Sequence, residues 1–174
     1  MKFARWIPVA MVVGLMAAFA IGLLMPKDDA VRSAWVGKPM PAIALPAATP
    51  GVEGITDALL RDGKPRLVNI FASWCIPCRA EARQLEALAA GGAIIEGVAL
   101  RDKPEDVRAF LDKYGNPYAH IGADTQSELA LALGSSGVPE TFLIDGKGIV
   151  RAQYQGAITE AQVPEILDAL RQMP

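Results

Sequence analysis

The chain has 174 residues, of which 52% are hydrophobic and 21% charged, and its formal net charge is −2. This length predicts a single domain, and the slightly acidic balance argues against a nucleic-acid-binding surface. Part of the hydrophobic content is concentrated in one run near the N-terminus.

That run, residues 7–25, carries no charge and is about long enough to span a bilayer core. Lys2 and Arg5 precede it, so the positive-inside rule predicts a cytoplasmic N-terminus and an exported remainder. A cleaved signal peptide is the alternative, with a small-x-small site at residues 18–20, but the apolar run continues past that site. We therefore expect an uncleaved membrane anchor at 1–25, a tether at 26–36 and a globular domain at 37–174. Both interpretations place the domain in an oxidising compartment.

The first half of the domain contains the strongest strand and helix patterns. We expect a short edge strand at 42–45, a helical turn at 55–61 and a buried apolar strand at 67–72. The next segment is rich in helix formers and ends at a pair of glycines. Its buried stripe is expected to consist of Ala82, Leu85, Leu88 and Ala89.

A strand is expected at 94–100, followed by a helix that opens with a capping box from Asp102 to Glu105. Apolar residues in this helix recur at helical spacing: Val107, Phe110, Leu111 and Tyr114. The remaining pattern indicates a short strand, a short helix and a hairpin: 118–121, 127–133, 141–144 and 149–154.

The start of the last helix stays open in the sequence. Residues 159–162 look like a capping box, yet Pro164 would then interrupt the hydrogen-bond ladder one turn later. Taken together, parallel strand–helix–strand units followed by an antiparallel hairpin predict an α/β domain whose mixed central sheet has helices on both faces.

Cys75 and Cys78, the two cysteines of the chain, lie where the buried strand passes into a helix. The helix start favours an anion, so we expect the pKa of the Cys75 thiol to be lowered and Cys75 to act as the nucleophile. Cys78 follows about one turn later and can resolve a mixed disulfide. Trp74 would offer an apolar surface beside the reactive sulfur.

Two structural interpretations of the cysteine pair are weaker. A structural disulfide usually closes a longer loop, and a structural zinc site needs four ligands, which two cysteines and His120 do not supply. We interpret His120 as a structural or surface residue. No metal and no cofactor are expected.

The order of the expected elements resembles the thioredoxin fold, a three-layer α/β/α arrangement, because the motif WCIPC at 74–78 opens a helix and Val138-Pro139 comes just before the hairpin. The segments GVALRD at 97–102, GNPY at 115–118 and GVPETFLIDG at 137–146 sharpen this resemblance. Together they are similar to the DsbE/CcmG family, the membrane-anchored thiol:disulfide oxidoreductases of cytochrome c maturation.

The resemblance implies that the Val138–Pro139 bond is cis and that the Val138 backbone pairs with a substrate peptide. Position 69 is Asn, where thioredoxin typically has a buried acid, so proton transfer needs another carrier. Glu81 and Glu140 are the candidates, and the alternative for each is a solvated charge or a helix cap. Residues 134–138 lack the aromatic residue that the family often has there.

The resemblance further implies a single-pass protein of the bacterial inner membrane with its redox domain in the periplasm. Its partners would be an apocytochrome c or a maturation thiol protein, and a transmembrane electron donor that restores the dithiol. A general exported reductase or oxidase, a tethered module that holds apocytochrome, and a peroxidase-like thiol enzyme are the alternatives. A CxxC motif alone does not reveal the direction of exchange.

Overall fold

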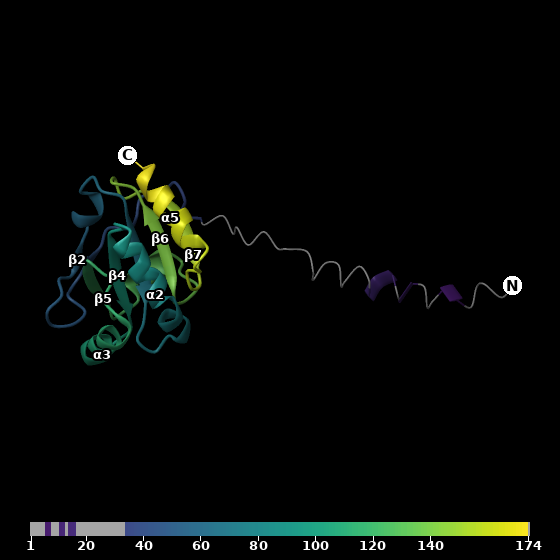
Figure 1. Ribbon diagram of the computed structural model, residues 1–174, viewed down its shortest axis with the longest axis horizontal. Coiled ribbons are helices and arrows are strands. Elements are labelled where there is room, and N and C mark those ends of the chain that lie inside the picture. Colours follow the sequence, from purple (N-terminus) through teal and green to yellow (C-terminus); the bar gives the residue numbers. More distant parts are fainter. Residues whose placement is uncertain (1–5, 8–10, 13, 17–33, 174) are drawn as a thin grey trace. The chain divides into compact units, whose positions relative to one another are not determined.

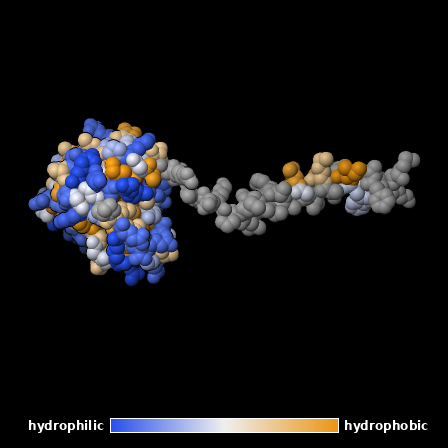
Figure 2. Space-filling view, turned by 90° about the horizontal axis from the view of Figure 1, so that it is seen from above, coloured by the Kyte–Doolittle hydropathy of each residue, from blue (hydrophilic) through white to orange (hydrophobic). Residues whose placement is uncertain are grey.

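The computed structural model describes residues 6–7, 11–12, 14–16 and 34–173. Most of the predicted anchor and tether lies outside these residues. Among those described, no helix is long and apolar enough to cross a membrane. The large apolar side chains described between residues 6 and 16 are exposed: Trp6, Ile7, Met11, Val12, Leu15 and Met16. Part of this segment is orange in Figure 2, toward the hydrophobic end of the scale.

Within residues 34–173, a mixed five-stranded sheet forms the centre of the domain, with strand order β5-β4-β3-β6-β7. Strands β3, β4 and β5 are parallel, β6 runs antiparallel to β3, and β7 runs antiparallel to β6. Their bounds are β3 Arg66–Phe71, β4 Ile95–Leu100, β5 His120–Asp124, β6 Glu140–Ile144 and β7 Val150–Gln155. Every residue of the central strand β3 is buried. The predicted mixed α/β sheet is thus confirmed.

The helices α2 (Ile76–Ala90), α3 (Pro104–Tyr114) and α5 (Gln162–Arg171) pack on one face of this sheet, and α2 and α5 lie side by side in Figure 1. Side chains alternate between the two faces along each strand. Leu67 and Phe71 of β3 therefore join the core beneath α2, which also contains both cysteines, whereas Val68 and Ile70 join a second core on the opposite face.

The second face is covered by short elements: β1 Ala44–Leu45, β2 Ile55–Thr56, the 3₁₀ helix η2 Leu59–Arg61 and α4 Glu128–Ala132. The helical turn predicted for 55–61 is wrong at its beginning. Ile55 is fully buried and pairs with Leu45 in an antiparallel ladder, so the segment starts extended and only 59–61 is helical.

The structure corrects the predicted start of α3 and determines the start of α5, which the sequence left open. Helix α3 begins after Lys103, without a side-chain cap, so the capping box predicted from Asp102 is wrong. In α5, Gln162 is the first residue, and its Oε1 accepts hydrogen bonds from the Thr159 N–H at 2.8 Å and hydroxyl at 3.0 Å. Pro164 thus falls in the first turn, where a missing N–H removes no helical bond.

Candidate active site

The dithiol centre is formed at the N-terminus of α2, where Cys75 and Cys78 are joined by a disulfide with a Cα–Cα separation of 5.3 Å. Cys75 is the N-cap residue, and its Sγ accepts a hydrogen bond from the Cys78 N–H at 3.1 Å. Pro77 occupies the first turn, where its missing N–H removes no helical hydrogen bond. A backbone N–H directed at Cys75 Sγ stabilises a thiolate there, so the geometry favours Cys75 over Cys78 as the nucleophile.

Glu81, one turn beyond Cys78 on α2, is buried with only 1% of its surface exposed. Its Oε1 accepts a hydrogen bond from Asn69 Nδ2 at 3.1 Å, and its Oε2 accepts one from the Ile158 N–H at 2.9 Å. Burial raises its pKa from the ordinary 4.5 to about 7, against the opposing effect of these two hydrogen bonds. Glu81 is therefore neither a solvated surface charge nor a helix cap, but a buried acid that titrates near neutral pH.

Asn69 holds this acid in place. Its Nδ2 also donates to Thr141 Oγ1 at 2.9 Å, and its Oδ1 accepts from the Tyr118 hydroxyl at 2.9 Å. Burial first, and then the nearby Glu81 charge, raise the pKa of Tyr118 well above its ordinary value, so Tyr118 remains a donor. Tyr118 and Thr141 are not among the site residues predicted from the sequence. The sequence feature that could have indicated them is Asn69, because an amide in an otherwise apolar buried strand requires polar partners.

Glu140 is also buried, at 1% exposure, but the structure does not bring it together with Glu81. It lies opposite Ile70 on β3, and directly paired residues share a face, so its side chain belongs to the face away from α2. Gln153 Nε2 donates to its Oε1, and Oε2 has no hydrogen-bond partner among the described residues. The two acids suggested by the sequence therefore occupy different surroundings.

The peptide bond between Val138 and Pro139 is cis, as the resemblance implies. Val138 is half-buried and packs against both cores, and the Pro139 carbonyl accepts a hydrogen bond from the Gly156 N–H at 3.0 Å. These contacts fix the segment that precedes β6.

Trp74 and His120 lie in contrasting positions. Trp74, adjacent to Cys75, is 55% exposed and therefore presents an apolar surface beside the disulfide. His120 does not belong to the dithiol centre: its Nδ1 lies 2.9 Å from Glu96 Oε2 on the face away from α2. This placement agrees with the interpretation of His120 as a structural residue.

The thioredoxin-type sheet and a Cys-x-x-Cys pair capping α2 define a dithiol–disulfide oxidoreductase. The sequence matches the Redoxin family over residues 35–170. It is 38% identical over 170 residues to the thiol:disulfide interchange protein HelX of Rhodobacter capsulatus. The aligned region covers 97% of this chain and 96% of the relative. It is 38% identical over 159 residues to DsbE of Yersinia pestis, covering 89% of this chain and 85% of the relative.

A crystal structure of a DsbE-type thiol:disulfide interchange protein from Chlorobium tepidum superimposes with a TM-score of 0.65 at 28% identity, covering 78% of this chain and 97% of that one. The chain therefore belongs to the DsbE/HelX family of thiol:disulfide interchange proteins.

The buried Glu81 predicts a pH dependence of stability in the oxidised protein, whose disulfide does not itself titrate. The unfolded carboxyl releases its proton near pH 4.5 and the folded one near pH 7, so the folded state binds more protons in this window. The free energy of unfolding should then fall by about 3 kcal/mol as pH rises from 4.5 to 7. Urea unfolding at several pH values measures this slope.

In Glu81→Gln that part of the slope should disappear, whereas Glu86→Gln, an exposed change on the same helix, should retain it. The slope is the readout, because the Gln amide also alters the bond to Ile158 at every pH. An unchanged slope in Glu81→Gln would show that Glu81 ionises normally.

Proposed function

We propose that this protein is a membrane-anchored reductase of the periplasm that reduces the disulfide of an apocytochrome c, or of a thiol protein that carries it, during cytochrome c biogenesis. The observation that carries the reducing direction is the buried Glu81 one turn from Cys78. Its ionised form disfavours a thiolate nearby, and a dithiol whose reduced form is less stabilised is a better reductant. The thiol:disulfide interchange activity named for the relatives supports the class of reaction.

In the proposed cycle, the Cys75 thiolate attacks one sulfur of the substrate disulfide. That S–S bond breaks, one substrate sulfur leaves as a thiolate that takes up a proton, and a mixed disulfide forms at Cys75. The Cys78 thiolate then attacks Cys75 Sγ and releases the second substrate sulfur. The substrate has gained two electrons, and the Cys75–Cys78 disulfide has formed. A transmembrane donor then returns two electrons to the pair.

Glu81 is the group that we propose to accept the proton of Cys78 as Cys78 becomes the attacking thiolate. Both side chains are buried in the core beneath α2, and residues three apart on a helix are neighbours. A pKa of about 7 allows Glu81 to take up and release a proton near neutral pH. Glu140, next to Pro139, is the second proposed proton carrier, acting from the other face of the sheet. Trp74 and the Val138 backbone are the proposed contacts for the substrate peptide.

The membrane attachment rests on residues 7–25, which carry no charge and follow two basic residues. With the first 25 residues as anchor and residues 26–36 as tether, the domain at 37–174 would meet its substrates close to the membrane surface.

The substrate is tested by a trapping experiment in the source cell with full-length Cys78→Ser. Mixed disulfides at Cys75 cannot be resolved in this variant, so they accumulate and are identified by mass spectrometry. We expect adducts with an apocytochrome c or with a cytochrome maturation protein. The double variant Cys75→Ser/Cys78→Ser is the control and should trap nothing. A broad set of exported proteins would instead indicate a general reductase or oxidase.

A further inference from the structure

Asp102 lies outside the dithiol motif, yet its carboxylate is directed at the residue two positions before Cys75. Oδ2 accepts a hydrogen bond from the Ser73 N–H at 2.6 Å, and Oδ1 accepts one from the Ser73 hydroxyl at 2.8 Å. Oδ1 also accepts from the Lys103 N–H at 3.1 Å. The side chain that local sequence assigned to capping α3 therefore joins the β4–α3 loop to the loop that carries the nucleophile.

Ser73 is held from the opposite side as well. The Arg79 guanidinium donates to the Ser73 carbonyl, with Nη2 at 2.8 Å and Nε at 3.3 Å. Every polar group of Ser73 thus has a side-chain hydrogen-bond partner, either Asp102 or Arg79. The indole of Trp74 is mostly exposed, so it contributes little packing to this turn. The Cys75 N–H closes the Ser73–Trp74 turn by donating to the Ala72 carbonyl at 3.1 Å, and the Asp102 and Arg79 side chains hold this turn against the neighbouring elements.

The backbone immediately before Asp102 is in a costly conformation. Arg101 has a φ of +48°, and residues with a Cβ atom rarely adopt this left-handed region because Cβ approaches the following carbonyl oxygen. Arg101 N–H also donates to the Asp124 carbonyl at 3.2 Å, which ties the turn to the end of β5. The fold retains this strain at the point where the chain leaves β4 and directs Asp102 toward Ser73.

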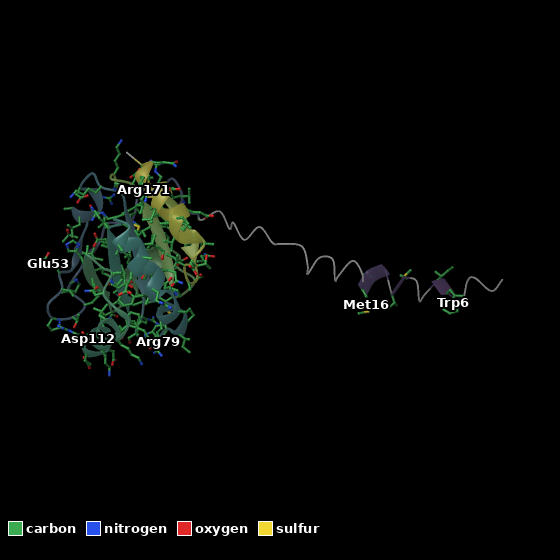
Figure 3. The ribbon with its side chains drawn as sticks, in the orientation of Figure 1. Trp6, Met16, Glu53, Arg79, Asp112 and Arg171 are labelled. Carbon is green, nitrogen blue, oxygen red and sulfur yellow. A yellow bond between two sulfur atoms is a disulfide. The ribbon has the colours of Figure 1, made fainter. Side chains whose placement is uncertain are left out.

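A cavity of about 430 Å³ opens between the elements that Asp102 joins. Ser73, Trp74 and Arg79 line one side, and α3 lines the other, including Phe110 and Lys113. Figure 3 shows Arg79 at the same end of the domain as Asp112 of α3. The contact between Asp102 and Ser73 joins the two loops from which these walls begin.

We propose that Asp102 is a positioning residue of the exchange reaction, which locks the Ser73–Trp74 turn to the start of α3 and so fixes how a peptide disulfide approaches Cys75. The geometry of the carboxylate, rather than its charge, performs this role. Misplacement by about 1 Å is enough to cost one or two orders of magnitude in rate. The inference rests on the exchange reaction and, for one of the probes below, on the proposed substrate class.

The test compares Asp102→Ala with Asp102→Asn. An Asn Oδ1 can accept from the Ser73 N–H and its Nδ2 can donate to the Ser73 hydroxyl oxygen, so Asn preserves both contacts with Ser73 without the charge and gives up only the hydrogen bond from the Lys103 N–H. Reduced proteins are mixed with an oxidised Cys-x-x-Cys peptide and with glutathione disulfide, and second-order rate constants are measured. Alkylation of Cys75 by iodoacetamide in the Cys78→Ser background reports the reactivity of the thiol itself. Glu105→Ala, an exposed change in the first turn of α3, is the matched control.

We expect Asp102→Ala to reduce both disulfides about tenfold more slowly. Asp102→Asn and Glu105→Ala should stay within about twofold of the unchanged protein, as should alkylation in the Asp102→Ala variant. If Asp102→Ala does not fold, Ser73→Ala removes the hydroxyl contact alone and should slow reduction two- to threefold. Wild-type rates in a folded Asp102→Ala variant, or equal losses in the Ala and Asn variants, would overturn the proposal.

A failure of the proposed substrate class gives a different result. In that case the unchanged protein reduces glutathione disulfide but not the peptide. The Asp102 comparison is then read from glutathione disulfide, with the same expected differences.

Discussion

Replacing Cys75 by Ser should abolish disulfide exchange, lowering the rate at least about a thousandfold. The group that attacks a disulfide sulfur is a thiolate, and the serine hydroxyl cannot replace it. Cys75 is also the sulfur that receives the N–H of Cys78 at the start of α2, whereas Cys78 is the more buried of the two, at 2% exposure. Cys78 alone should therefore not substitute for it. Reduction of glutathione disulfide by the purified domain measures the loss.

The matched control is Cys78→Ser, which should still form a mixed disulfide in a single turnover but should not complete the cycle. Both variants are compared with the reduced unchanged protein by circular dichroism, because each lacks the disulfide constraint. If Cys75→Ser retains most of its function in cells, the thiols are secondary. The protein would then be a tethered module that holds its partner.

The second large effect is expected far from the dithiol, in the ion network formed by Arg66, Glu96 and His120. Arg66 Nη1 lies 2.6 Å from Glu96 Oε1, and the two side chains are 2% and 0% exposed. Removing Arg66 leaves the buried Glu96 carboxylate without its guanidinium partner and with His120 Nδ1 as its remaining contact, and breaking a buried pair in this way costs about 3–5 kcal/mol. Arg66→Leu should therefore lower the free energy of unfolding by about this amount. Urea denaturation of the oxidised protein measures it.

A double variant separates loss of the pair from loss of packing. Arg66→Leu/Glu96→Leu removes both buried charges, so it should be more stable than Arg66→Leu alone. Arg171→Leu is the surface control, because its ion pair with Asp168 is 64% exposed on both sides and should contribute less than about 1 kcal/mol. An Arg66→Leu variant as stable as the Arg171→Leu variant would show that the network is unimportant for stability. Glu53, which lies 3.8 Å from His120, and Arg79 are well apart in Figure 3, so exchange rates should change little in the folded variants.

The dithiol and its helix could be predicted because their signals are local. Cys75 and Cys78 are three residues apart, and the apolar strand and the helix formers flank them directly. The stripe predicted on this helix is also found, with Ala82, Leu85 and Leu88 buried and Ala89 half-buried. Periodicity alone specifies such features, because neighbouring residues on one element share an environment.

The environment of the dithiol could not be predicted, because it depends on contacts between distant residues. Asn69 meets Tyr118 and Thr141 across sequence separations of 49 and 72 residues. The strand register places Thr141 opposite Asn69, and Tyr118 comes from the segment before β5. The same register places Glu81 and Glu140 on opposite faces, although the sequence suggested them as equivalent candidates. For Asp102, a local signal was misleading. Its spacing to Glu105 matches a capping box, but its carboxylate binds Ser73 and does not cap α3.

The reduction potential of the Cys75–Cys78 pair tests the central claim, a reducing dithiol, most directly. The purified domain is equilibrated with glutathione buffers of known ratio at pH 7, and the oxidised fraction is determined by thiol alkylation and mass spectrometry. We expect a potential closer to about −200 mV than to about −120 mV, the value of the strong oxidant DsbA. Glu81→Gln should shift the potential upward, because it removes the charge that disfavours a nearby thiolate. A potential at or above about −120 mV would mean that the protein is an oxidant and would contradict the account.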